Sequence, residues 1–98
     1  GGENGKSGNK KDDRKAAAQA REKEQQLRKE AKAAESELAR LTAERGAVDQ
    51  AMFDPSTAAP KLAKLTMGEL MKRRAELNEA IEVAELRWLE VSESLEPA

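Results

Sequence analysis

The stretch Leu27–Met52, LRKEAKAAESELARLTAERGAVDQAM, decides the fold. Within it, apolar residues recur at alternating spacings of four and three, which places them on one stripe of a helix. A single helix cannot bury such a stripe, so the pattern predicts a helical partner. Only Arg45 interrupts the apolar content. The stripe consists of Leu27, Ala31, Ala34, Leu38, Leu41, Arg45, Val48 and Met52.

The second half of the chain supplies that partner, because the same alternation of spacings returns there. The segment between the two stripes, residues 53–60, has the sequence FDPSTAAP, and its prolines disfavour a continuous helix. Two heptad helices joined by a short turn predict an all-α fold, a two-helix antiparallel coiled-coil hairpin. The second stripe is Ala63, Met67, Leu70, Arg74, Leu77, Ile81, Ala84, Trp88, Val91 and Leu95.

The domain boundaries follow from composition. Residues 1–13 contain no apolar residue, so we expect a disordered linker there. The hairpin then covers residues 14–96, with a first helix over about 14–52, a turn over 53–60 and a second helix over about 61–95. Thr66-Met67-Gly68-Glu69 has the form of a capping box, which predicts a regular helix from this point.

Folding the chain back about residue 58 or 59 predicts which residues face one another. The numbers of facing residues then sum to roughly 115–119. Leu70 is expected to meet Val48. Trp88 is expected to meet Leu27, Ala31 and Ala34, because a large indole opposite two alanines fills the space. Phe53 is expected to close the turn end of the hairpin.

Composition argues against catalysis by this chain. Its 98 residues allow one domain, 38% of them are charged, and the aromatic residues are Phe53 and Trp88 alone. The absence of histidine and cysteine removes the usual base, nucleophile and thiolate ligand. We therefore expect no enzyme activity, no catalytic residue, no metal and no cofactor. The lack of an 18-residue apolar run predicts no membrane partner, a cytoplasmic location is the default expectation, and we expect a monomer.

The net charge of −1 conceals two oppositely charged halves. Residues 1–34 carry ten basic and six acidic residues, whereas residues 35–98 carry eight and thirteen. The basic residues of the first part are expected around most of the helix circumference. They fit either a solvated helix with pairs such as Glu24–Arg28 or a phosphate-binding segment. They are Arg14, Lys15, Arg21, Lys23, Arg28, Lys29 and Lys32.

Three segments resemble a known family. They are Phe53-Asp54-Pro55 at the turn, Pro60–Leu65 after it, and Glu85–Glu90, which contains Arg87-Trp88. Together with the basic lead-in over residues 14–32, they resemble the C-terminal coiled-coil domain of ABC-F ATPases, over about residues 14–96. The resemblance implies a parent protein whose own ATPase domains bind ATP and Mg²⁺ and which acts on ribosomes. In one branch of this family the C-terminal domain binds DNA.

The resemblance and the charge pattern give the first functional hypothesis, which is non-specific binding of DNA or ribosomal RNA through basic side chains. The alternative is a protein-contact or spacer hairpin that does not bind nucleic acid and can self-associate. An apolar stripe of Val83, Leu86 and Leu89 outside the main stripe supports this alternative. The candidate nucleic-acid-binding residues are Arg14, Lys15, Arg21, Lys29, Lys32, Arg40, Arg45, Lys72, Arg73 and Arg74.

Overall fold

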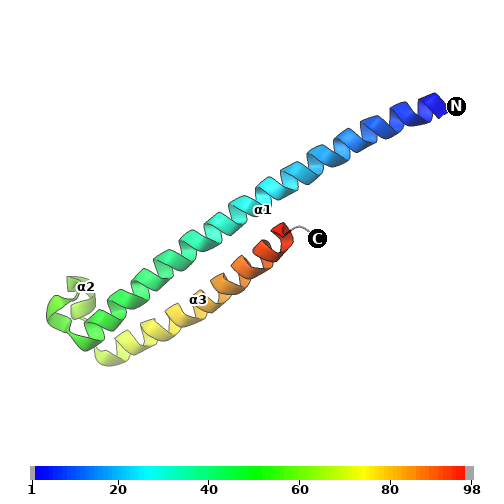
Figure 1. The fold of residues 1–98 in the computed structure, drawn as a ribbon. Helices are drawn as coiled ribbons and strands as arrows, with labels where there is room; N and C mark the ends of the chain where they lie inside the picture. The colour runs from blue at the N-terminus through cyan, green and yellow to red at the C-terminus, as the bar shows by residue number, and fades with distance from the viewer. Residues whose placement is uncertain (1, 97–98) are drawn as a thin grey trace.

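The computed structural model describes the backbone of residues 2–96 and the side chains of residues 10–96. The elements are α1 (Gly2–Phe53), a short 3₁₀ helix η1 (Pro55–Thr57), α2 (Pro60–Ala63) and α3 (Met67–Leu95). No strand occurs within the described range, so the all-α prediction is confirmed. The molecule is a rod of 80 × 19 × 18 Å in which α3 runs back along α1 (Figure 1).

Helix α1 continues well past the end of α3, as Figure 1 shows. It includes residues 2–13, which the composition assigned to a disordered linker; residue 1 lies outside the described residues. Side chains from Lys10 to Gln26 are all exposed, because α3 ends beside Leu27. A helix without tertiary packing is marginal in water. Disorder of residues 1–13 in solution therefore stays a prediction.

Apolar side chains of α1 and α3 meet along one line, which we call the seam. Its buried members recur at heptad spacing on both helices, as expected where two helices interdigitate. Val48 is the most completely buried large side chain, with 1% of its surface exposed. No polar or charged side chain is buried among the described residues, so apolar contact stabilises the helix pair. The buried residues are Ala34, Leu41, Val48, Ala51, Leu70, Leu77, Ile81, Ala84 and Val91.

Polar contacts between α1 and α3 show how the two helices are aligned. The residue numbers sum to 117 for Arg73–Glu44 and Arg87–Glu30, and to 123 for Arg74–Asp49 and Trp88–Glu35. The sequence predicted roughly 115–119 for facing pairs. The midpoint of the two observed sums, 120, lies just above this range because the turn contains η1 and α2, which place the midpoint of the fold near Pro60.

Local hydrogen bonds hold the turn. The Asp54 side chain caps η1 by accepting from the Ser56 amide at 3.3 Å. At the start of α3, the Glu69 amide donates to the Thr66 hydroxyl and the Thr66 amide donates to the Glu69 carboxylate, both at 3.1 Å. These reciprocal bonds satisfy amides that the first helical turn leaves without partners. The predicted capping box is therefore confirmed.

The expectation that Phe53 closes the turn end was wrong, because its side chain is 90% exposed. Leu62 and Leu65 pack against the seam at that end instead, together with Ala58. Trp88 lies on the seam but is only half-buried, since its indole N–H reaches outward to the Glu35 carboxylate at 3.1 Å. These differences arise from the path of the turn, which heptad spacing does not encode.

Truncating a buried seam residue tests the packing. Leu77→Ala removes a side chain that is 6% exposed, so the free energy of unfolding should fall by about 2–5 kcal/mol. Met71→Ala, on the same helix at 57% exposure, is the matched control and should stay within about 0.5 kcal/mol of the unmodified chain. Urea denaturation followed by circular dichroism measures both. Equal effects would contradict the assignment of the seam.

The capping box gives a second prediction. Thr66→Ala removes the hydroxyl that accepts from the Glu69 amide, so unfolding should become easier by about 1 kcal/mol. Thr42→Ala changes the same residue type at an exposed position inside α1, where alanine is the better helix former, and should not destabilise. The same denaturation assay decides, and a Thr66→Ala chain as stable as the unmodified one would rule out the cap.

Because Trp88 is only half-buried, its truncation should destabilise the chain less than truncation of a fully buried aromatic residue. Trp88→Ala should lower the free energy of unfolding by about 2 kcal/mol, below the range for a fully buried aromatic side chain. Trp88→Phe keeps most of the packing and loses only the exposed hydrogen bond to Glu35, so its effect should be about 1 kcal/mol or less. If Trp88→Ala unfolds like the unmodified chain, the indole does not pack against α1 in solution.

Candidate nucleic-acid interface

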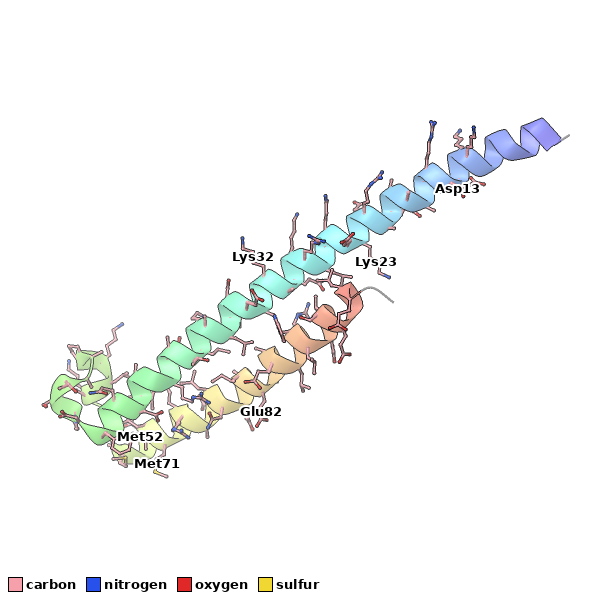
Figure 2. All side chains as sticks on the ribbon, in the orientation of Figure 1. Asp13, Lys23, Lys32, Met52, Met71 and Glu82 are labelled. Atoms are coloured by element: carbon pink, nitrogen blue, oxygen red, sulfur yellow. The ribbon has the colours of Figure 1, made fainter. Side chains whose placement is uncertain are left out.

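Basic residues gather on the side of α1 that faces away from α3. Arg14, Arg21 and Lys32 are separated by seven and eleven residues, which are close to two and three helical turns, so they lie nearly in line. Figure 2 shows Lys32 pointing away from α3, within a row of nitrogen-tipped side chains along that side of α1, whereas Lys23 points to the opposite side. We call this row the basic row. It consists of Arg14, Lys15, Arg21, Lys29 and Lys32.

The five residues of the basic row lie on one half of α1, whereas Lys23 lies on the opposite side, so the basic charges together still spread around much of the helix, as expected. A rotation of 100° per residue places Lys15 and Lys29 to one side of the line through Arg14 and Lys32, on the same half of the helix. All five side chains are exposed. Among the described side chains, none of the five forms an ion pair. Their charges therefore remain available to an anion from solution.

Arg40 differs from the basic row because two carboxylates of its own helix hold it. Its guanidinium lies 2.6 Å from Glu37 and 2.8 Å from Glu44. The hydrogen bond from Arg40 lowers the pKa of the Glu37 carboxyl, and the same bond raises the pKa of Arg40. A phosphate would have to compete with both carboxylates for this side chain.

The other arginines beside the seam are also engaged. Arg74 donates to Asp49 at 2.6 Å, and Arg73 lies 3.4 Å from Glu44. Arg45 donates to the Asn78 side-chain oxygen at 2.9 Å. These contacts join α1 to α3, so they align the helix pair.

Lys72 is exposed and lies near basic residues that the sequence analysis did not select. Lys61 of α2 lines a shallow groove with Lys72 and Arg73, and Lys64 is exposed just after α2. Glu69 and Glu76 line the same groove, so its charge is mixed. Only the folded turn brings Lys61 to α3, and no sequence spacing indicates this proximity. The structure thus separates the candidate residues into an unpaired row on α1, arginines held by neighbouring carboxylates or by Asn78, and Lys72 in a groove of mixed charge near the turn.

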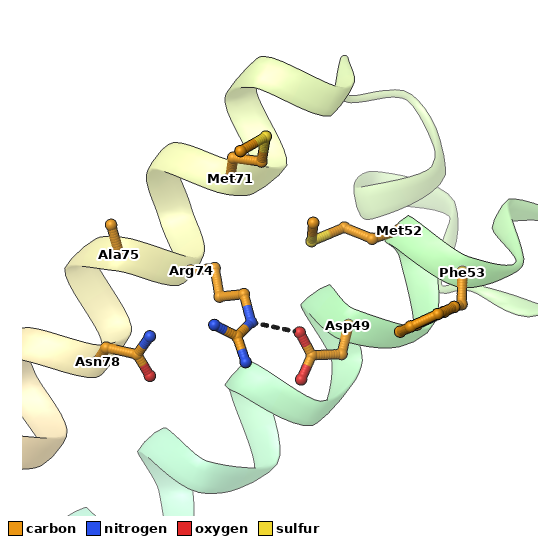
Figure 3. Close-up of a pocket in the computed structure, with 7 residues that line it drawn as sticks. All are labelled: Asp49, Met52, Phe53, Met71, Arg74, Ala75 and Asn78. Atoms are coloured by element: carbon orange, nitrogen blue, oxygen red, sulfur yellow. Dashed lines mark hydrogen bonds and ion pairs between the residues drawn. The ribbon is translucent and has the colours of Figure 1, made fainter.

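A second groove lies on another side of the helix pair, near the turn. Met52, Phe53 and Met71 border it, and the Arg74–Asp49 ion pair lies along its wall (Figure 3). The ion pair neutralises both charges, and the groove is open to solvent. The arrangement offers apolar contact beside a paired arginine and aspartate.

The described residues contain no cluster of three or more side chains suited to hold a metal ion. None of the described helices combines the length and apolar character needed to cross a membrane. No family model, curated protein or solved structure matches the chain.

Proposed function

We propose that the chain is an antiparallel coiled-coil hairpin that serves as an accessory domain of an ABC-F type ATP-binding protein and binds nucleic acid without sequence specificity. The observation that carries the proposal is the basic row, five exposed cations without carboxylate partners on one side of α1. The resemblance of the turn and of the Arg87-Trp88 segment supports the assignment of the domain. ATP and Mg²⁺ would belong to ATPase domains of the parent protein.

The geometry of the basic row suits a phosphate backbone. From Arg14 to Lys32 the row extends about 27 Å along a straight helix, at 1.5 Å per residue. Over that axial distance one strand of a duplex carries about eight phosphates, at 3.4 Å per phosphate, and those on the side facing α1 are within its reach. Lysine and arginine contacts to phosphate supply affinity without reading bases. The hairpin has only two aromatic residues, so stacking on bases contributes little.

Removing part of the basic row tests the proposal. The triple variant Arg21→Ala/Lys29→Ala/Lys32→Ala should weaken binding to a fluorescent 20-base-pair DNA duplex, as measured by anisotropy over a salt series. Each lost phosphate contact should reduce the slope of log affinity against log salt by about 0.9. The same measurement with an RNA stem-loop compares DNA with RNA as target.

The matched control removes three arginines that carboxylates already hold: Arg40→Ala/Arg73→Ala/Arg87→Ala. It changes the net charge equally, so a purely global charge effect would weaken binding as much as the triple variant of the basic row. We expect a smaller loss of affinity and a nearly unchanged salt slope. Equal losses, or no binding of the unmodified chain at low salt, would reject the basic row as the interface.

A further inference from the structure

Helix α3 carries an exposed apolar patch on the side that does not face α1. Leu86 and Leu89 are 61% and 47% exposed, and Val83 is 66% exposed. Leu86 lies two residues before the seam residue Trp88, so a rotation of 100° per residue places it on nearly the opposite side of α3. We call Val83, Leu86 and Leu89 the outer patch.

Glutamates stand on both sides of the outer patch along the axis of α3. Glu82 and Glu90 lie four residues before and after Leu86. Glu79 and Glu93 lie seven residues before and after it. These spacings are close to one and two helical turns, so the four carboxylates share the side of α3 on which Leu86 lies. All four side chains are exposed, and Figure 2 shows Glu82 pointing away from α1.

A shallow groove on this side of α3 combines apolar and acidic walls. Leu86, Leu89, Glu82 and Glu85 line it. A long basic side chain suits such a surface, because its apolar stem can cover the leucines while its charged end meets a carboxylate. The groove therefore favours a ligand that brings apolar contact and positive charge together.

The negative charges of this side are not neutralised within the described chain. None of the six glutamates from residue 79 to residue 96 forms an ion pair with a described side chain. The one basic residue of that range, Arg87, lies 4.0 Å from Glu30 of α1. The helix dipole also disfavours the charge of Glu93 in the last turn of α3, which contains no basic residue. These carboxylates therefore do not stabilise the hairpin and stay open to a cationic partner.

The charge of this side selects the chemistry of the partner. Phosphates of a nucleic acid or of an anionic membrane would be repelled, so this surface differs in kind from the basic row. A matching partner has apolar side chains at its centre and positive charges one and two helical turns to either side. An amphipathic helix lying along α3 presents this arrangement, because its own side chains recur at the same period.

Neither long helix of a second copy of this chain offers such a surface. Every residue of α1 between Lys10 and Met52 that is apolar and larger than alanine lies on the seam stripe. The stripe of α1 beyond the end of α3 is acidic at both ends, with Asp13 and Glu24 flanking two alanines. The outer side of α3 itself is acidic and would repel its equivalent.

We propose that the outer patch docks a positively charged amphipathic helix of another protein, packed lengthwise along α3. Apolar residues of that helix cover Leu86 and Leu89, and its lysines or arginines pair with the glutamates before and after them. Three apolar side chains with a solvated rim of charge make a small contact, which is typical of a weak and reversible complex. The basic row points away from α3, so both surfaces can be occupied at once.

A designed peptide tests the proposal. The probe is a fluorescein-labelled helix with two leucines at its centre and lysines one and two turns to either side, on a background of alanine and glutamine. Fluorescence anisotropy at low salt should show micromolar binding to the full chain. A peptide with glutamate in place of each lysine, and another with glutamine in place of each leucine, should each bind at least about tenfold more weakly.

Variants of the apolar centre locate the binding surface. Leu86→Ala/Leu89→Ala should weaken binding of the lysine–leucine peptide by about tenfold or more. Met67→Ala/Met71→Ala is the matched control, since these residues are 51% and 57% exposed on the same helix but lie near the turn, and it should leave binding unchanged. Circular dichroism should show the same helix content for both variants, because all four side chains are exposed.

Variants of the charges test the match of sign. Glu82→Lys/Glu90→Lys should weaken binding of the lysine–leucine peptide by about tenfold, because it places like charges opposite one another. Asp12→Lys/Glu22→Lys makes the same change in net charge at exposed positions of α1 and should have a much smaller effect. Equal losses from the two double variants would show attraction by overall charge alone and would overturn the proposal.

Further outcomes distinguish the other possible occupants. The proposal fails if the lysine–leucine peptide binds no more tightly than its two control peptides, or if Leu86→Ala/Leu89→Ala leaves its binding unchanged. A dimer in sedimentation equilibrium that this variant dissociates would assign the outer patch to a second copy. Phosphatidylcholine vesicles that bind the unmodified chain but not the variant would assign it to a membrane surface. Because no nucleic acid is present and no residue of the basic row is changed, these results are separate from the proposed nucleic-acid binding.

Discussion

Apolar contact between one side of α1 and one side of α3 is the interaction on which the structure depends. Among the side chains that the structure describes, nine buried residues, none larger than leucine or isoleucine, line it, and no buried polar side chain contributes. Such a contact is narrow, so we expect neither helix to be stable alone. The residues outside the seam determine little of the fold. Charged residues on the other sides are therefore not needed for the core, and those of the basic row form no ion pair among the described side chains.

The spacing of apolar residues predicted the seam because residues buried along one side of a helix recur in the sequence at the helical period. Leu41, Val48, Leu77 and Ile81 are buried where the heptad pattern placed them. The turn has no such periodic pattern of apolar residues. Leu62 packs at the turn end of the helix pair, where Phe53 was expected, because a four-residue helix that begins at Pro60 precedes the capping box and redirects the chain. Several chain paths fit the composition of this segment.

The candidate interface was harder to predict than the fold, because whether a basic side chain is free to bind an anion depends on carboxylates that the folded helix pair brings near it. Arg73 and Lys72 are adjacent in the sequence, yet Arg73 lies near Glu44, twenty-nine residues away, while Lys72 forms no ion pair within the described part of the chain. Arg40 is held by Glu37 and Glu44 of its own helix, whereas Lys32 forms no ion pair with any side chain that the structure describes. The helical alignment of Arg14, Arg21 and Lys32 could have been found by applying the 3.6-residue period to charges as well as to apolar residues.

The repeat of small apolar side chains along the seam has a mechanical consequence. Sliding α3 along α1 by seven residues, about 10 Å, places apolar residues opposite apolar residues again. Apolar contact alone therefore opposes such sliding weakly. The Arg45–Asn78 and Arg74–Asp49 contacts oppose such sliding in the half of the rod nearer the turn, and the Trp88–Glu35 hydrogen bond opposes it nearer the open end. Polar contacts at the edges of the seam, spread along the rod, therefore fix the position of α3 along α1 that the apolar repeat leaves undetermined.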